Sequence, residues 1–498
     1  MSAKGQPDTA CRRTGVQLRA RALTIACLIG ATFGGGCRCK GETLAPIVFD
    51  ENEDREPIDP AHVLAPPWQA PAIAQLDNGA LLHWLREVDS PAFHLRVLLP
   101  TSIHAERLTA AEVAVALEAL ELRLSARLRR IGGVKLALRS RPGRVELAVH
   151  GRDVDAEAVI AAVADSLADA GNPKLLSVAQ GKVLAARAEV EPATVAAAAL
   201  IATLTNRPLE HELIIKDGLI DLSKGREERS WSLLTDPRDA TIIVHSGLSL
   251  EDEGIAQSVA YLSERWHARL ALRSGEPSVT ARLRGQDHVP RKPAQTWLMT
   301  ESSPAAMSVY AGEPGRGGRG EVMLGRLIPT PTAKQRILIR LCQRLMQEEL
   351  DARLIDAGPI SVFAVRVRIS PDDPVRSLTR IIERIQAFGG ELHPRDRVEQ
   401  AARLWLGARV VAASLQGEDW TALWSESIDL ASEDREIFTA LAREAEEMLA
   451  VEPEDLREAF AQWFDPRGGE PGWVWVGAGI DEAMATKLEG RIELLRVE

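Results

Sequence analysis

Cysteine is scarce in this sequence and almost absent from its main part. Of the five cysteines in 498 residues, four lie within the first 39 positions and only Cys342 lies beyond them. The main part of the chain therefore cannot form an internal disulfide, and no two cysteines have the Cys-x-x-Cys spacing of a structural zinc site. Because Cys342 falls on the apolar stripe of a predicted helix, we expect it to pack as a buried thiol.

An excess of positive charge is also lacking. The chain has 60 lysines and arginines against 71 aspartates and glutamates, which gives a net charge of −11. A nucleic-acid-binding domain usually presents a basic surface, so we expect no nucleic-acid partner. Apolar residues make up 45% and charged residues 26% of the chain, which are ordinary values for folded domains, and the length allows two or three of them.

The apolar run near the amino terminus is shorter than the roughly 20 residues that span a membrane. It covers residues 22–33, follows four arginines, and is followed by three glycines and Cys37. This pattern is typical of a secretory signal peptide, here residues 1–36. The glycines before Cys37 resemble a bacterial lipoprotein processing site, although Gly34 stands where that site usually has leucine. We therefore expect lipid on Cys37, with simple cleavage or an uncleaved signal as alternatives.

Residues 37–70 combine acidic side chains and prolines with few apolar residues. Dense like charge and proline keep such a segment extended, so we interpret it as a tether between the lipid anchor and the folded part. Acyl chains on Cys37 would hold the protein at a membrane of the bacterial cell envelope, facing the periplasm or the exterior. The acidic residues are Asp50, Glu51, Glu53, Asp54, Glu56 and Asp59, and the prolines are Pro57, Pro60, Pro66 and Pro67.

The rest of the chain contains one order of elements twice: strand, helix, strand, helix, further helices, and a strand that ends in a glycine turn. Apolar residues spaced by three and four predict the helices, and alternation predicts the strands. We therefore predict an α+β fold of two homologous domains, 71–271 and 296–498, each a mostly antiparallel sheet covered by helices, with a glycine- and proline-containing linker at 272–295. The elements are expected at 94–101, 110–130, 145–149, 156–168 and 241–247, and again at 323–330, 332–354, 365–369, 375–387 and 473–479.

Short patches in this repeat resemble the insulinase/pitrilysin-type zinc peptidases, to which the mitochondrial processing peptidase is similar. Residues 76–79, Leu-Asp-Asn-Gly, with the apolar runs 81–85 and 95–99, are similar to the first hairpin of that family, and Asn-Gly favours a tight turn. Residues 237–240 resemble the approach to its closing strand, and Trp266 stands where the family often has a tryptophan. The resemblance covers about residues 70–498 and implies two domains arranged as a clamshell.

The same resemblance implies that the zinc site has been lost. Active members bind zinc through an HxxEH motif on the first long helix, whose glutamate is the general base, and through a downstream glutamate. In the best register Val115 and Ala119 stand at the histidine positions and Glu118 at the base position. A register shifted by three residues restores no histidine either. We expect no cofactor, because valine and alanine cannot coordinate zinc.

Other site residues of the family have partial counterparts. The resemblance places the downstream zinc ligand at Glu189 or Glu191, although a solvated helix surface explains both side chains better. Arg353 corresponds to a substrate-holding arginine of the second domain, but no tyrosine lies near it. His83, His94 and His104 could in principle share a metal ion, but strand alternation and an intervening turn argue against a common focus.

Three functions are compatible with these patterns. We favour a non-catalytic peptidase homologue at the cell envelope that serves as the partner or substrate-binding subunit of an active zinc peptidase, with peptide or unfolded polypeptide as its ligand. The first alternative is a stand-alone peptide-binding or scaffold lipoprotein. The second is a zinc endopeptidase with an atypical site, the one case in which zinc would be a cofactor. Fold alone does not decide among them.

Overall fold

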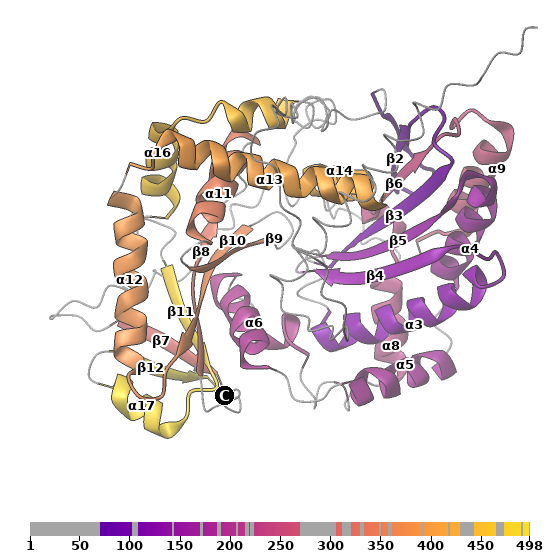
Figure 1. Cartoon of the computed structure of the whole chain (residues 1–498). Helices are drawn as coiled ribbons and strands as arrows, with labels where there is room; N and C mark the ends of the chain where they lie inside the picture. The colour runs from indigo at the N-terminus through magenta and orange to yellow at the C-terminus, as the bar shows by residue number, and fades with distance from the viewer. Residues whose placement is uncertain are drawn as a thin grey trace, which may run out of the picture.

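The fold is described here from a computed structural model of the chain, in which two lobes each contain one sheet (Figure 1). The predicted signal peptide, Cys37, nearly all of the tether, the linker, Glu189 and His104 lie outside the described residues. No helix in the described part combines the length and apolarity needed to span a membrane. The described residues are 70–101, 108–141, 144–169, 173–186, 191–205, 208–214, 219, 224–268, 305–310, 320–328, 333–347, 350–356, 361–390, 392–416, 419–428, 443–464, 473–489 and 492–497.

The first sheet has six strands in the order β1-β2-β6-β3-β5-β4. Only the β2–β6 pair is parallel. As the Asn-Gly pair predicts, β1 and β2 form a hairpin in which Gly79 has a φ of 93°. The side chain of Asn78 donates to the carbonyl of Trp266 (2.7 Å), which ties this turn to the end of the lobe. The strands are β1 Ala72–Gln75, β2 Leu81–Arg86, β3 Ala92–Pro100, β4 Lys135–Arg141, β5 Arg144–Arg152 and β6 Thr241–Ser246.

Five helices of the first lobe cover one face of this sheet, on the outer side of the molecule (Figure 1). The longest, α3, begins at Thr109, where Thr109 and Glu112 form a capping box. Alternate strand residues such as Leu82, Trp84 and Val97 pack beneath the helices in one apolar core. The helices are α3 Ala110–Leu128, α4 Ala156–Ala168, α5 Pro173–Ala186, α8 Lys224–Leu234 and α9 Glu253–Arg265.

The second sheet has the strand order β12-β7-β11-β8-β10-β9 and lies under the helices of the second lobe. Its core contains Phe363, Trp473 and Phe464, and also Cys342, which is buried as the sequence predicts. The strands are β7 Ala305–Tyr310, β8 Gly320–Ile328, β9 Asp351–Asp356, β10 Ser361–Ile369, β11 Trp473–Ala478 and β12 Ile492–Val497. The helices are α11 Ala333–Met346, α12 Pro374–Gly390, α13 Arg395–Gln416, α16 Pro453–Trp463 and α17 Glu482–Leu488.

The two sheets match position by position, as the repeat in the sequence predicts. Strands β2, β6, β3, β5 and β4 correspond in order to β7, β11, β8, β10 and β9. The outermost strand differs, because β1 precedes β2 and is antiparallel to it, whereas β12 ends the chain and is parallel to β7. The structure is therefore a mixed α+β fold with two related sheets.

Among the strands that the sequence analysis missed are the two edge strands β4 and β9. Strand β4 contains four lysine, arginine or serine residues in seven, and such charged edge strands lack the β-branched residues that indicate a strand. The helix expected at 332–354 was wrong at its end, because α11 stops at Met346 and Asp351–Asp356 form β9. Leu354 continues the helical spacing by chance, since its pairing with Phe363 of β10 makes it part of a strand.

The two halves of the chain exchange one helix each. Helix α6 (Pro192–Thr205), from the first half, packs on the second sheet through Val195, Leu200 and Leu204. It lies so close that a methyl group on Gly325 would collide with Leu200. Helix α14 (Asp419–Ile428), from the second half, lies on β3 and β6 of the first sheet. We call the face of each sheet that is covered by the helix from the other half its inner face.

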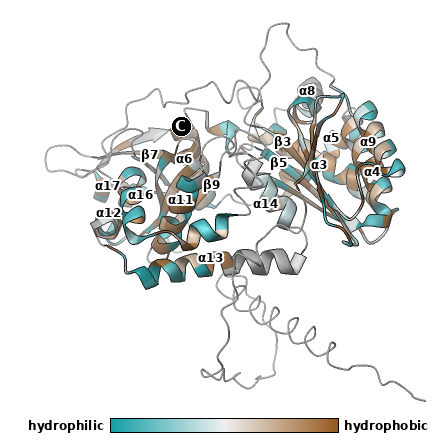
Figure 2. Ribbon diagram, turned by 90° about the horizontal axis from the view of Figure 1, so that it is seen from above, coloured by the Kyte–Doolittle hydropathy of each residue, from teal (hydrophilic) through white to brown (hydrophobic). Residues whose placement is uncertain are grey.

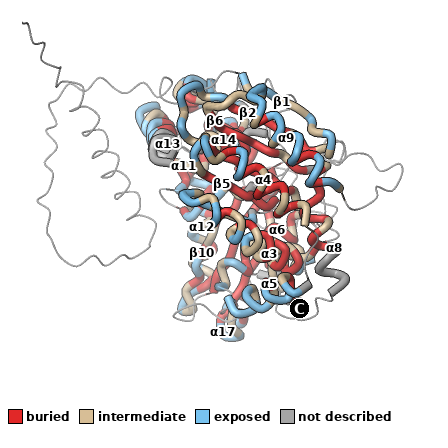
Figure 3. Tube along the Cα trace, turned by 90° about the vertical axis from the view of Figure 1, so that its right-hand side faces the viewer, coloured by how far each residue is buried: buried red, intermediate tan, exposed pale blue. Residues whose placement is uncertain are grey.

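Figure 2 shows α13 extending from the second lobe to α14, so that one long helical connection delivers α14 to the first sheet. Figure 3 shows the strands as the buried layer of the molecule, with exposed residues gathered on outer helices such as α5, α13 and α17. Both faces of each sheet are thus covered, one by its own lobe and the other at least partly by the exchanged helix.

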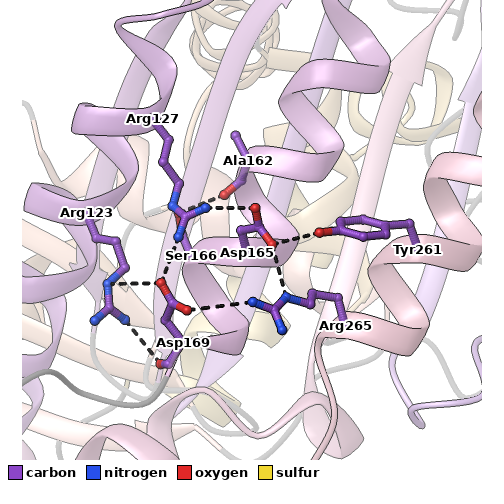
Figure 4. Close-up of polar contacts among 8 residues, drawn as sticks. All are labelled: Arg123, Arg127, Ala162, Asp165, Ser166, Asp169, Tyr261 and Arg265. Carbon is purple, nitrogen blue, oxygen red and sulfur yellow. Dashed lines mark hydrogen bonds and ion pairs between the residues drawn. The ribbon is translucent and has the colours of Figure 1, made fainter.

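A cluster of ion pairs joins three helices on the outside of the first lobe (Figure 4). Asp165 of α4 accepts from Arg127 of α3 (2.8 Å), and from Tyr261 (2.8 Å) and Arg265 (3.1 Å) of α9. Asp169 accepts a second bond from Arg127 (2.7 Å). The cluster fixes the helix layer that holds α3 in position, although partly exposed pairs of this kind each add only a fraction of a kcal/mol.

The docking of α6 gives a first prediction. We expect Leu200→Ala to lower the free energy of unfolding by about 2–5 kcal/mol, because Leu200 is fully buried between α6 and the second sheet. Urea denaturation of the two proteins measures the difference. The matched control is Leu184→Ala on the exposed side of α5, which should cost well under about 1 kcal/mol. Equal effects of the two substitutions would contradict this packing.

Candidate functional site

The three predicted zinc positions lie on the first long helix, α3. Val115 and Ala119 are 2% and 1% exposed and belong to the apolar core of the first lobe. Glu118 is partly exposed, and its carboxylate lies 3.0 Å from the ammonium group of Lys182 on α5. The two predicted histidine positions thus hold buried apolar side chains, and Glu118 has a lysine as its partner.

Lys182 is a site residue that the sequence analysis missed. It lies on α5, which packs along α3. The partner of Glu118 is therefore a residue 64 positions further along the chain, which only the packing of the two helices brings close. An ammonium group beside the carboxylate balances the charge of Glu118 without any metal. Because both side chains are partly exposed, the pair itself contributes little to stability.

The structure does not bring Glu191 to this ion pair. Glu191 directly precedes α6 and is exposed. Its charge acts on Arg366 of β10 in the second sheet, where hydrogen bonds to Glu321 are the main cause of the raised pKa of Arg366 and Glu191 adds a smaller effect. The proposed remnant ligand therefore lies with the second sheet, whereas Glu118 contacts Lys182 of the first lobe.

Arg353 lies on the edge strand β9 of the second sheet. It stands opposite Ala364, which belongs to the apolar cluster under α6, so Arg353 is on the inner face. Its guanidinium group contacts Asp351 (2.9 Å), and more than half of its side chain is exposed.

The inner face of the first sheet contains four buried histidines. Alternation along β2, β3, β5 and β6 places His83, His94, His150 and His245 opposite the apolar core, with each 7% exposed or less. The Nδ1 atoms of His94 and His150 are 2.8 Å apart, and the rings of His94 and His245 stack at 5.7 Å. His245 also contacts Glu87 (2.8 Å).

This arrangement corrects one sequence-based argument. Strand alternation does not separate His83 from His94, because they lie on different strands with β6 between them and share the inner face. They still form no common site, since His83 contacts Trp424 and His94 contacts His150. Within the ranges given above, no group of three or more His, Cys, Asp or Glu side chains is placed to hold a metal ion.

A buried ionic triad lies beside the histidines and holds α14. Glu146 accepts from Arg96 (3.0 Å) and Arg144 (2.8 Å), and all three side chains are buried. Arg96 also donates to Thr421 of α14 (3.3 Å), and Arg144 to the carbonyl of Ser425 (3.2 Å). These bonds couple the first sheet to the second half of the chain.

Trp424 completes the contact between α14 and the first sheet. It is fully buried, and its indole N–H donates to Nδ1 of His83 (3.1 Å). Because the indole group can only donate, His83 must have Nδ1 unprotonated. The helix is therefore seated on a polar surface by directional hydrogen bonds, whereas α6 is seated on the second sheet by apolar packing.

Burial keeps His94, His150 and His245 of this face neutral at pH 7. It is the main cause that lowers the pKa of His94 to about 4 and of His150 to about 3, and the charge of Arg96 lowers both further. Burial also lowers the pKa of His245, although Glu87 acts in the opposite direction. Protonation would place positive charge beside Arg96 in a closed layer, which is unfavourable.

These pKa values predict that the protein loses stability in acid. The unfolded chain takes up protons near pH 6.5, whereas folded His94 and His150 stay neutral. Their contribution to the free energy of unfolding is therefore fully present above pH 6.5 and falls as the pH drops towards 4. The slope should reach about 1.4 kcal/mol per pH unit for each histidine. Urea denaturation of the wild type and of His94→Gln/His150→Gln across this range should give a shallower slope for the variant.

The control for this prediction is His267→Gln, because His267 is exposed at the end of the first lobe. It should leave the slope of the wild type unchanged. A double variant that keeps the full slope would show that His94 and His150 do not cause the acid sensitivity.

Comparison with known proteins gives matches in structure only. No known family model matches the sequence, and no curated protein matches it. The fold is similar to the peptidase M16 inactive domain from Pseudomonas fluorescens, with a TM-score of 0.59 and 11% identity over 82% of this chain and 98% of that one. A protease from Helicobacter pylori gives a TM-score of 0.59 and 12% identity over 82% of this chain and 99% of that one.

The periplasmic protease PqqL from Escherichia coli is similar over 88% of this chain, with a TM-score of 0.58 and 12% identity. This chain spans 49% of PqqL, about half its length. At these identities the likeness concerns the fold. The chain therefore has the fold of the M16 peptidases, the insulinase/pitrilysin type, as the Asn-Gly hairpin, the repeated elements and the closing strand indicated.

Proposed function

We propose that this protein is a non-catalytic peptidase homologue of the cell envelope, which acts as the partner or substrate-binding subunit of an active zinc peptidase. The observation that carries the proposal is the burial of Val115 and Ala119 in the apolar core of the first lobe. A zinc-dependent hydrolase needs imidazole or carboxylate ligands and an open coordination position for water, and a packed apolar core offers neither.

The remaining chemistry around α3 supports the same conclusion. Glu118, at the position assigned to the general base, is paired with Lys182, and the apolar side chains of Val115 and Ala119 could not hold the metal that would supply it with an activated water. The histidines of the inner face contact one another, Glu87 and Trp424 instead of converging on one point. An atypical zinc site is therefore less well supported than a site without metal.

Polypeptide binding is supported by the two inner faces. We infer that the lobes form a clamshell in which exposed polar groups such as Arg353 meet a peptide or unfolded polypeptide. The predicted signal at 1–36 and lipid on Cys37 would place this clamshell at the cell envelope. PqqL, one of the similar proteins, is described as periplasmic, which agrees with such a setting.

Zinc content and peptide cleavage test the absence of catalysis. We expect the body from Pro66 to Glu498 to contain no bound zinc by elemental analysis and to leave unstructured peptides intact. The variant Val115→His/Ala119→His tests whether the two predicted ligand positions belong to the apolar core. We expect it to be less stable than the wild type, because two imidazoles would enter that core. Stoichiometric zinc with chelator-sensitive cleavage in the wild type would contradict the proposal.

Affinity purification of the cross-linked full chain from its own membranes tests the partner. An active zinc peptidase should co-purify, and Cys37→Ser, which removes the predicted lipid attachment, should release the protein from the membrane fraction. Recovery of the protein without any peptidase would favour the stand-alone binding or scaffold lipoprotein.

A further inference from the structure

The edge strand β4 of the first sheet carries two exposed cations on the inner face. Lys135 stands opposite His150 and Arg139 opposite Glu146, and both partners lie on the inner face, so Lys135 and Arg139 do as well. Both side chains are exposed, and neither has a hydrogen-bond or ion-pair partner among the residues that the structure describes. Lys135 and Arg139 thus lie on a strand that pairs with no further strand of the described residues on its outer side.

The charges behind these two residues do not neutralise them. At the inner-face positions of the six strands, Glu146 is the one carboxylate. One oxygen of Glu146 contacts Arg96 and the other contacts Arg144. The charge of this carboxylate is thus already balanced by two arginines, although Arg139 stands opposite it in the sheet. This part of the face therefore has an excess of positive charge, in a chain whose net charge is −11.

The titration of the neighbouring histidine agrees with this excess. After burial and the contact with His94, the charges of Arg96, Lys135 and Arg139 all lower the pKa of His150. A positive potential therefore extends from the edge strand into the buried layer.

We propose that the basic edge, defined as Lys135 and Arg139 with Arg96 and Arg144 behind them, selects acidic segments of extended polypeptides. The inference rests on the proposed function in polypeptide binding and names the class of ligand. An edge strand presents unpaired N–H and C=O groups that an extended peptide can pair with. Alternate side chains of such a peptide fall on the inner face, where glutamate or aspartate would meet Lys135 and Arg139, about 13 Å apart.

An acidic polypeptide fits this surface better than a basic or a neutral one. The cations are exposed and free, so a carboxylate gains an ion pair without breaking an existing one, whereas a lysine would face like charge. The negative charge of the rest of the chain repels an acidic ligand elsewhere and directs it to this edge.

Fluorescence anisotropy with the full chain in detergent tests the selectivity. The probes are three labelled peptides of equal length and the same apolar residues, whose alternate positions are all Glu, all Gln or all Lys. We expect the Glu peptide to bind about ten-fold or more tightly than the Lys peptide. Its affinity should fall as salt is raised, because exposed charge pairs are screened.

Charge reversal tests the place of binding. We expect Lys135→Glu/Arg139→Glu to weaken the Glu peptide about ten-fold and to favour the Lys peptide instead. The matched control is Arg376→Glu/Arg380→Glu, which changes the net charge equally at two exposed arginines four residues apart on α12. The control should bind like the wild type, and circular dichroism should show that both variants are folded.

The outcomes separate this inference from the proposed function. Equal binding of all three peptides would overturn the selectivity and leave polypeptide binding in place. Absence of binding for every peptide would count against both. Unchanged binding of the Glu peptide to Lys135→Glu/Arg139→Glu would show that the basic edge is not the site. Single-stranded DNA that binds as tightly as the Glu peptide would also overturn the proposal, because it would indicate capture of any anion.

Discussion

The structure depends on the need to cover both faces of two sheets. Each lobe has helices for one face of its sheet, and the other face would be left with its polar or apolar side chains open to water. The chain solves this by exchange, since α6 of the first half lies on the second sheet and α14 of the second half lies on the first. Neither half can therefore reach its final packing alone, and the long helical connection through α13 follows from the same requirement.

The two exchanged helices are held by different forces. Under α6 the second sheet offers Met323, Leu327 and Val476, and a glycine at 325 lets Leu200 approach closely. Under α14 the first sheet offers histidines and the Arg96–Glu146–Arg144 triad, and the contact is made by hydrogen bonds. Apolar contact tolerates small shifts, whereas directional hydrogen bonds to buried charges do not. The apolar contact thus holds α6 on the second sheet, whereas the hydrogen bonds also fix the orientation of α14 on the first sheet.

The sequence indicates the general architecture of this protein well and its site only in part. Periodicity finds α3, α4 and α12, and the Asn-Gly turn and Trp266, which turn out to be bonded to each other, are visible as local patterns. The assignment of Val115 and Ala119 to the zinc-ligand positions stays a prediction from the sequence, to which the structure adds that both side chains are buried. By contrast, β4, β9 and the pairing of Glu118 with Lys182 depend on contacts between distant segments, so no local pattern could predict them. The crossing of α6 to the other lobe is the clearest case, because an alanine-rich helix looks the same whichever sheet it covers.

The difference between the two inner faces bears on what the first one is for. A buried ion pair or triad adds little net stability, and apolar residues of similar volume often do as well or better. The second sheet, with the same strand order, covers its inner face under α6 with apolar residues, so the fold does not require charge at this layer. Burying Arg96, Arg144, Glu146 and four histidines in the first sheet is thus an energetic cost that packing does not explain. Such a cost is characteristic of functional surfaces, and it lies beside Lys135 and Arg139 of the edge strand β4.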